Sequence, residues 1–542
     1  MDALRDAAGD EGGAGAAAGG AGNAAARDTA RPGDTGARDT GGAGDTAARD
    51  AARAGDTGAR DTGGAGNTAA RDTARAGDTG ARDTGGAGNT AARDAARAGD
   101  TGARDAARRR DAAVRAAVEQ GLLDSEPLVC LLDTAGIRAS AAALTGAFAA
   151  ATAAGTAVLH AFAAKAAPLV PVLRLLADCG LGCEVASAGE LALARAAGIP
   201  AERIVLDSPA KTTGELREAL ALGITVNADN HQELERLDAL IAAAPTRSPI
   251  GVRVNPQTGA GAIDALSTAT ATSKFGIGLR DPGARERLVR ACLDRPWITR
   301  LHAHSGSQGL PLPLIARGVR ELHALAEEIN AAAGRRQVDT LDIGGGLPVN
   351  FASDEETPTY AEYADALREA VPALFDGSYG LVTEFGRSLL AKHGTVLARV
   401  EYTKATGGRP IALTHAGVQV ATRTVYAPAA WPLRILPYDA KGLPKTGPPV
   451  AQDVAGPACF AGDLLATARD LPELAPGDLI AVPDTGAYFF TAHYGYNSLP
   501  RPPVHGFTAG PPGPVRFTPV RPAQTTTEIV AEAGGALRDA LL

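Results

Sequence analysis

The stretch Thr156-Ala-Val-Leu-His-Ala-Phe-Ala-Ala-Lys165 is an apolar run that ends in one of only seven lysines in a chain of 542 residues. Arginine supplies most of the positive charge, so a lysine at the end of an uncharged run stands out. Lysine can lose its proton and form an imine, whereas arginine stays charged. The alternative is that Lys165 extends to solvent from the end of a buried strand.

This stretch is the first of a series in which a short apolar strand, a polar or glycine-rich turn and an amphipathic helix follow one another. Strands are predicted at 157–164, 183–186, 204–206, 224–227, 251–254, 298–304, 340–343 and 381–383. Helices are predicted between them at 168–177, 187–197, 213–222, 232–243, 282–293, 312–333 and 360–374. Eight strand–helix units of this length are typical of a closed parallel (β/α)8 barrel, with a doubly wound open sheet as the alternative.

The segments on either side of this region differ from it in composition. Residues 1–112 contain Gly-Asp-Thr-Gly-Ala-Arg-Asp with a 22-residue period, and the repeated unit lacks large apolar side chains, which predicts a disordered tail. Residues 113–154 are expected to hold a helix near 113–121, a strand at 127–133 and a helix near 139–153. The barrel is assigned to 155–397. A mainly antiparallel β-domain with strands that include 418–425 is assigned to 398–515, and a C-terminal tail with a helix to 516–542.

Composition excludes several classes of protein. The net charge of −8 argues against a nucleic-acid-binding protein. Residues 139–164 are almost uncharged, but they are rich in alanine, glycine and threonine, so no membrane span is predicted. The five cysteines have an odd number and irregular spacing, which favours free thiols, no metal site and a cytoplasmic location. No signal peptide is indicated at the N-terminus.

Polar and glycine residues gather where the predicted strands end, which is the edge of a barrel that carries chemistry. Besides Lys165, these ends supply His304 and Ser307, the run Gly344-Gly345-Gly346, and Glu384 with Arg387. The glycines after the seventh strand and an arginine after the eighth predict a phosphate site. A lysine, a phosphate site, a histidine and a carboxylate together indicate pyridoxal 5′-phosphate, with the carboxylate on the pyridine nitrogen.

These motifs resemble those of the fold-type III pyridoxal-phosphate decarboxylases, the group of diaminopimelate, ornithine and arginine decarboxylases. The resemblance covers roughly 126–510. It rests on Phe162-Ala-Ala-Lys165, Glu184–Glu190, Ser273–Ile277, His302–Gln308, Asp342–Gly346, Glu384–Arg387, Gly456-Pro-Ala-Cys459, Gly486-Ala-Tyr488 and Tyr496-Asn497.

The resemblance implies an alanine-racemase-like barrel with a β-domain, which the strand at 127–132 joins. It also implies an amino-acid substrate and a homodimer with shared active sites. Lys165 would carry the cofactor, and Cys459 of one subunit would protonate the carbanion in the site of the other. The implied cofactor-binding residues are Lys165, His304, Ser307, Gly344, Gly345, Gly346, Glu384, Gly386, Arg387 and Tyr488.

The substrate-binding positions depart from that family. The residue after the cysteine, acidic in the typical members, is Phe460 here, which cannot pair with an ammonium group. Arg423 and Tyr426 lie near the positions of an arginine and a tyrosine that bind a distal carboxylate, with a spacing one residue shorter. The sequence therefore predicts a decarboxylase of a non-standard amino acid, with an apolar or carboxylated tail or a carrier attached. An amino-acid racemase is one alternative, which Glu384 disfavours, and a non-catalytic regulatory relative is another.

Overall fold

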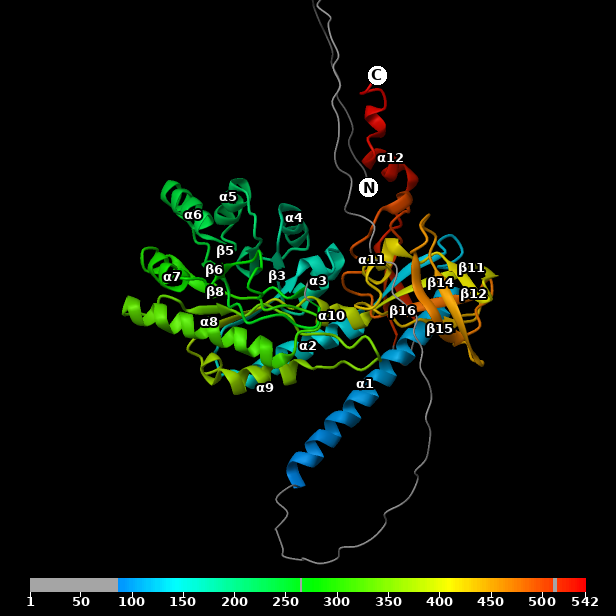
Figure 1. Cartoon of the computed structure of the whole chain (residues 1–542), viewed down its shortest axis with the longest axis horizontal. Helices are drawn as coiled ribbons and strands as arrows, with labels where there is room; N and C mark the ends of the chain where they lie inside the picture. The colour runs from blue at the N-terminus through cyan, green and yellow to red at the C-terminus, as the bar shows by residue number, and fades with distance from the viewer. Residues whose placement is uncertain (1–85, 264–265, 510–513) are drawn as a thin grey trace, which may run out of the picture. The chain divides into compact units, whose positions relative to one another are not determined.

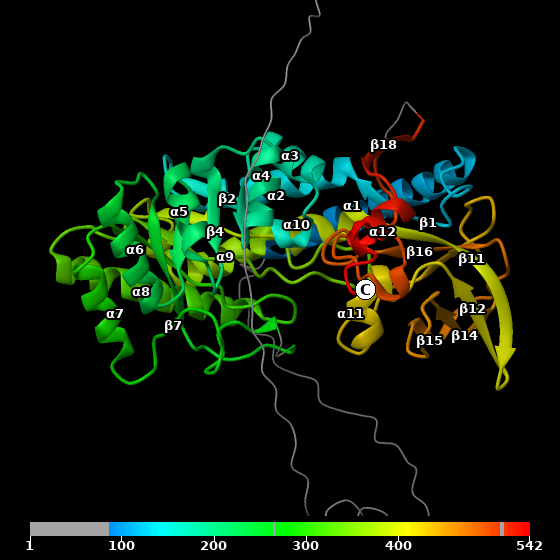
Figure 2. The same cartoon turned by 90° about the horizontal axis from the view of Figure 1, so that it is seen from above.

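The computed structural model describes residues 86–263, 266–509 and 514–542, with side chains from residue 101 onward. The disordered tail was predicted for residues 1–112, of which residues 1–85 lie outside the described part of the chain. Figures 1 and 2 show two groups of elements: parallel strands surrounded by helices, and a separate group of mostly β-strands. No helix of the described part is long and apolar enough to cross a lipid bilayer.

The barrel prediction is confirmed. Neighbouring strands pair in parallel from β2 round to β10, and β10 then pairs with β2 to close the ring. The strands are β2 (Val158–Ala163), β3 (Gly182–Val185), β4 (Ile204–Asp207), β5 (Thr225–Ala228), β6 (Ile250–Asn255), β8 (Ile298–His302), β9 (Thr340–Asp342) and β10 (Gly380–Thr383), with a short β7 (Ile277–Gly278) beside β6. The helices are α3 (Val170–Asp178), α4 (Ala188–Ala196), α5 (Thr213–Leu222), α6 (His231–Ala243), α7 (Ala284–Leu293), α8 (Leu312–Ala333), α9 (Tyr360–Ala370) and the short α10 (Arg387–Leu390).

The second sheet is mixed rather than purely antiparallel, because β1 pairs in parallel with β17 and β12 pairs in parallel with β14. Its strands are β1 (Leu128–Asp133), β11 (Gly394–Thr406), β12 (Arg409–Thr414), β13 (Leu436–Tyr438), β14 (Pro449–Ala455), β15 (Leu464–Pro472), β16 (Leu479–Pro483), β17 (Val504–Thr508) and β18 (Arg516–Arg521). Strand β1 precedes the barrel in sequence but joins this sheet, as expected. Strand β18 pairs with β17, so the sheet extends past the predicted boundary at 515.

The segment predicted as a strand at 418–425 is instead a helix, α11 (Val418–Tyr426). Its valines and threonines favour a strand, which misled the prediction. The backbone N–H of Val418 donates to Asp463 Oδ1 at 2.6 Å, so a carboxylate from the β14–β15 turn caps the first turn. This tertiary cap supplies what the local sequence lacks.

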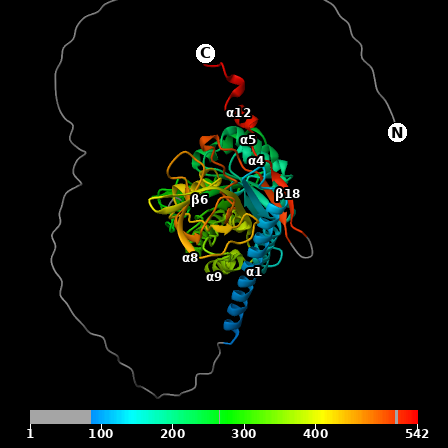
Figure 3. The same ribbon diagram turned by 90° about the vertical axis from the view of Figure 1, so that its right-hand side faces the viewer.

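The first described helix, α1 (Gly86–Glu119), begins before the boundary predicted at residue 112 (Figure 3). Alanine favours the helix, and contacts far along the chain hold its C-terminal part. Ala113, Val114 and Ala117 belong to a buried cluster with Val129 and Leu397 of the second sheet. The expected short helix at 113–121 is therefore the end of a longer one.

Three consecutive residues of α1 fasten it to different elements. Arg109 pairs with Asp133 at 2.7 Å, and Asp111 accepts a hydrogen bond from Tyr438 Oη at 2.6 Å. Arg110 contacts both oxygens of Asp354, at 2.7 and 3.2 Å. The remaining helices are α2 (Thr134–Ala151), which follows β1, and α12 (Thr526–Glu532), which is shorter than the helix predicted at 525–542.

Asp354 lies in the loop after the glycine run, and it also pairs with Arg434 of the second sheet's part of the chain at 2.7 Å. Burial alone would raise the pKa of Asp354, but the hydrogen bonds from Arg110 and Arg434 hold that pKa well below its ordinary value. Its ion pairs therefore stabilise the fold at neutral pH.

We expect Asp354→Asn to lower the free energy of unfolding at pH 7 by about 1–3 kcal/mol, because two partly buried guanidinium groups lose their carboxylate. The effect should shrink as the pH falls below about 4, the ordinary carboxyl range, because wild-type Asp354 is then protonated in the unfolded chain and loses its stabilising effect. Urea denaturation at several pH values measures both quantities.

Arg115→Ala is the matched control on the same helix. Arg115 pairs with Glu119, and both side chains are more than half exposed. It should change the free energy of unfolding by less than about 0.5 kcal/mol. An equal loss in the two variants would contradict the special role of Asp354.

Candidate active site

A cavity of about 240 Å³ opens at the C-terminal ends of the barrel strands. Eleven of its lining residues were predicted from the sequence as site residues or belong to the quoted motifs, and they come from the barrel and from the β-domain. They are Ala163, Lys165, Phe275, His304, Ser307, Gly346, Glu384, Gly386, Arg387, Arg423 and Tyr488. Among them, Arg423 lies on α11.

Lys165 lies in a single helical turn, η1 (Ala164–Ala166), directly after β2. Its Nζ lies 2.6 Å from Glu184 Oε2, and about half of the lysine side chain faces open space while Glu184 is buried. Burial alone would lower the pKa of Lys165, but Glu184, and then Tyr488 and Glu384, raise that pKa above its ordinary value. In the cofactor-free chain Lys165 is therefore a cation held by Glu184.

Residues of the β-domain hold the turn that carries Lys165 in place. The carbonyl of Ala166 accepts hydrogen bonds from the Tyr488 backbone N–H at 2.9 Å and from Thr491 Oγ1 at 2.8 Å. Tyr488 adopts a positive φ of 64°, a conformation that is uncommon outside glycine. Its position beside Lys165 is thus set by the backbone contact.

The glycine run lies where only glycine fits. Gly344 and Gly346 have φ angles of 66° and 103°. A Cβ on Gly345 would lie 2.3 Å from the Glu384 carbonyl oxygen, and one on Gly346 would lie 2.3 Å from the Gly306 carbonyl oxygen. Because the backbone is this close-packed, its loop presents main chain rather than side chains to the cavity.

Arg387 brings positive charge to the same wall. Its guanidinium carbon lies 4.6 Å from the centre of the Tyr488 ring, and that of Arg423 also lies 4.6 Å from it. Burial lowers the pKa of Arg387 to about 10. Its Nε and Nη1 are buried without a hydrogen-bond partner. Two donors of a cation thus lack an acceptor beside the glycine run.

His304 and Glu384 occupy the middle of the cavity. His304 Nδ1 accepts the Gly345 N–H at 3.1 Å, and burial, with Arg253 and Lys165 nearby, keeps the pKa of His304 well below its usual value. Its ring is therefore neutral and suited to stacking. Burial and Asp342 raise the pKa of Glu384 well above its ordinary value, and its Oε1 has no partner.

These unpaired groups match pyridoxal 5′-phosphate. A phosphate group would accept from Arg387 and from the backbone of the glycine run, a pyridine nitrogen would meet Glu384, and an aldehyde would lie in reach of Lys165. When bound, this cofactor supplies an electron-withdrawing ring that stabilises the negative charge left as CO2 departs.

Five of the predicted site residues are not among those that line the cavity: Gly344, Gly345, Tyr426, Cys459 and Phe460. Cys459 is exposed in the β14–β15 turn, where its backbone N–H donates to Asn497 Oδ1 at 2.7 Å. Phe460 stacks on Tyr426, with ring centres 5.8 Å apart and planes 8° apart. Tyr494 and Tyr496 pack on these rings edge-on, which makes an aromatic cluster next to Cys459.

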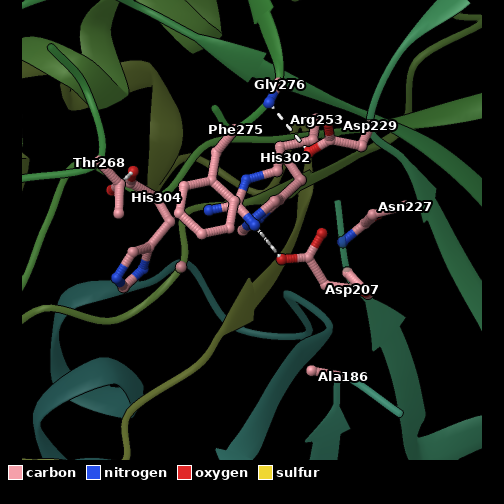
Figure 4. A network of polar contacts seen from close by, with 12 residues as sticks. Ala186, Asp207, Asn227, Asp229, Arg253, Thr268, Phe275, Gly276, His302 and His304 are labelled. Atoms are coloured by element: carbon pink, nitrogen blue, oxygen red, sulfur yellow. Dashed lines mark hydrogen bonds and ion pairs between the residues drawn. The ribbon is translucent and has the colours of Figure 1, made fainter. Parts of the chain in front are cut away.

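No role was predicted from the sequence for a layer of buried charge that lies beneath the cavity (Figure 4). Asp207 contacts Arg253, and His302 lies beside them, while His304 is directed away from this group. Each of these residues stands at or near the end of a barrel strand, which was the available signal. The ligand atoms of Asp207, His302 and Glu384 lie within 4.8 Å of one another, as in a metal site. The guanidinium of Arg253, however, already provides positive charge beside Asp207.

Comparison with known proteins points the same way. Residues 141–391 match the family model described as "Pyridoxal-dependent decarboxylase, pyridoxal binding domain". The diaminopimelate decarboxylase of Pseudomonas aeruginosa is 35% identical over 355 residues, which cover 64% of this chain and 81% of that protein. The enzyme of the same name from Aquifex aeolicus is 30% identical over 331 residues, which cover 61% of this chain and 76% of that one.

A solved structure gives a similar result. A point variant of diaminopimelate decarboxylase from Helicobacter pylori, in complex with L-lysine, superposes with a TM-score of 0.67 at 25% identity. The match covers 77% of this chain and all of that one. The chain therefore belongs to the fold-type III pyridoxal-phosphate-dependent decarboxylases and is an amino-acid decarboxylase similar to the diaminopimelate decarboxylases.

Proposed function

We propose that this enzyme removes CO2 from an amino acid whose side chain ends in an apolar group or a carboxylate rather than an ammonium. The observation that carries the proposal is Phe460, which follows Cys459 and forms part of the aromatic cluster. An aromatic ring gives no charge-assisted hydrogen bond to an ammonium group. The related Helicobacter pylori enzyme, in contrast, was solved with L-lysine, which ends in an ammonium.

Arg423 supports the carboxylate alternative within this substrate class. Its guanidinium lies at the cavity wall, and its buried Nη1 has no partner. Tyr426, one helical turn further along α11, belongs to the aromatic cluster instead. The same short helix thus presents a cation to the cavity and an aromatic ring to Phe460.

In the proposed mechanism Lys165 would hold the cofactor, and His304 would stack on its ring. Glu384 would accept a hydrogen bond from the ring nitrogen and so favour its protonated form. The phosphate would be held by Ser307, Gly344, Gly345, Gly346, Gly386, Arg387 and Tyr488. The unpaired atoms of Glu384 and Arg387 support these roles.

We propose further that the active form is a homodimer in which Cys459 acts in the partner's cavity. Cys459 is exposed and absent from the lining of its own cavity, although Lys165, His304 and Glu384 all reach that lining. A thiol that donates a proton must touch the reacting carbon.

The five unpaired cysteines support a reducing, cytoplasmic setting.

Lys165→Ala should abolish CO2 release and the near-visible absorbance of the attached cofactor, because alanine offers no amine. Lys211→Ala is the control, because that lysine also pairs with a glutamate, Glu233 at 2.9 Å, but does not line the cavity. Absorbance spectra of both proteins after incubation with the cofactor measure the difference. Retained attachment in Lys165→Ala would contradict the assignment.

Mixing two inactive variants tests the shared site. In a mixed dimer of Lys165→Ala and Cys459→Ala subunits, both defects fall in the same cavity, so the other cavity has both wild-type residues. Unfolding and refolding an equal mixture should restore about a quarter of wild-type activity, because half of the dimers are mixed and each has one intact cavity. Cys179→Ala in place of Cys459→Ala controls for loss of a thiol. Absence of recovery in refolded dimers would contradict the shared site.

Substrate choice is tested with a panel of amino acids. The wild type should release CO2 faster from leucine, phenylalanine or 2-aminoadipate than from lysine, ornithine or meso-diaminopimelate. Phe460→Glu should improve kcat/KM for the ammonium-ended substrates relative to the others by about tenfold or more, as one added charge-assisted contact predicts. Phe460→Leu, which adds no charge, is the control. Rapid wild-type turnover of meso-diaminopimelate would contradict the exclusion by Phe460.

A further inference from the structure

His302 lies beneath the cavity floor and is fully buried. Three carboxylates flank its imidazole. Asp342 Oδ1 is 3.1 Å from Nδ1, while Asp207 Oδ2 and Glu384 Oε2 are 3.5 and 3.8 Å from Nε2. They arrive from β9, β4 and the end of β10, so closure of the barrel brings them together. Negative charges that are this close together and buried from solvent repel one another strongly unless a cation lies among them.

Two of the other nearby cations already have carboxylate partners. Lys165 contacts Glu184, and Arg253 contacts Asp207. Within the described part of the chain, His302 is the cation that lies within ion-pair distance of Glu384 and of Asp342. The protonation state of Glu384 therefore depends on the charge of the His302 imidazole.

We propose that His302 is a positioning residue for the reaction: as a buried imidazolium, it favours the anionic form of Glu384, which can accept a hydrogen bond from the cofactor's ring nitrogen. This inference rests on the role proposed above for Glu384. It assigns His302 a task different from that of His304, which stands two residues later and faces the cavity.

The electrostatics of the cluster support opposite charges on the two histidines. Burial alone would lower the pKa of His302, but Asp342, Glu384 and Asp207 raise that pKa well above its usual value. Burial and Asp342 raise the pKa of Glu384, and His302 opposes them. His304 lacks such carboxylate neighbours at ion-pair distance, and burial leaves it neutral.

The charged and titratable groups that face His302 and Glu384 come from most of the barrel strands. They are Lys165 after β2, Glu184 on β3, Asp207 on β4, Asp229 after β5, Arg253 on β6, Arg300 and His304 on or after β8, and Asp342 on β9, with Lys211 beyond Asp207.

The Asp342 contacts extend this cluster to the phosphate loop. Asp342 Oδ1 accepts the Gly344 N–H at 3.0 Å, and Oδ2 accepts from Asn227 Nδ2 at 3.1 Å. With these two donors and His302, the carboxylate of Asp342 is fixed in place. A charge change at His302 would thus act on Glu384 directly and on the glycine run through one carboxylate.

The first measurement uses the protein without cofactor. Imidazole nitrogen NMR at pH about 8.5, where an ordinary histidine is neutral, should show one protonated imidazole. That signal should vanish in His302→Gln and persist in His160→Gln. His160 is the matched control, because it is buried on β2 and its Nδ1 lies 2.8 Å from Thr383 Oγ1, the residue next to Glu384. A spectrum without a protonated imidazole would overturn the proposal.

The second measurement compares binding of pyridoxal 5′-phosphate with binding of its analogue in which carbon replaces the ring nitrogen. His302→Gln should weaken binding of the natural cofactor by about tenfold or more, as a shift of one pKa unit predicts. Binding of the carbon analogue should weaken less, because that analogue has no ring nitrogen to donate to Glu384, whereas any effect that reaches the phosphate loop through Asp342 is common to both ligands. Equal weakening of both would show a merely structural role and overturn the proposal.

Glu384→Gln separates this proposal from the one on which it rests. It should remove the preference for the nitrogen-containing ring while the protonated imidazole remains, because Asp207 and Asp342 still flank His302. If Glu384→Gln keeps that preference, the proposed role of Glu384 fails, and with it the task assigned to His302. Loss of the preference in Glu384→Gln but not in His302→Gln would overturn the inference about His302 alone.

Discussion

The pairing of β10 with β2 closes the barrel, and the active site depends on that closure. The register sets Thr383 opposite His160, and beyond it the Ala163 N–H donates to the Phe385 carbonyl at 3.1 Å. Lys165 and Glu384 are 219 positions apart in the chain, yet this backbone contact places both at one cavity. An open sheet would leave the first and last strands at opposite edges.

Closure also concentrates charge, which is the second constraint on this protein. Strand ends that converge on one cavity bring Asp342 together with Glu184, Asp207 and Glu384, and burial penalises the charged forms of the last three. Lys165, Arg253 and His302 lie among them at ion-pair distances. In the cavity above, by contrast, Arg387 Nε and Nη1 and Glu384 Oε1 have no hydrogen-bond partner among the described residues. Polar groups of the cofactor would bind to these atoms.

Sequence reasoning reached the barrel because a period of strand, turn and helix is a local property. It failed where local preference and tertiary contact disagree. The valine-rich run of α11 forms a helix because Asp463, more than forty residues later, caps it. The glycine-containing repeats reach into α1 because Arg109, Arg110 and Asp111 each find a partner elsewhere. None of these partner residues could be identified from the sequence of the segment itself.

The sequence alone determined the order of the strands, the residues at their ends and the replacement of an acidic residue by Phe460, because side-chain type and spacing are written in the chain. Only the tertiary structure decided which of two histidines is charged, that Arg423 reaches the cavity while Tyr426 turns to Phe460, and that Cys459 lies away from its own lysine. Charge state depends on distances to groups from several strands, and those distances exist only after the barrel has closed.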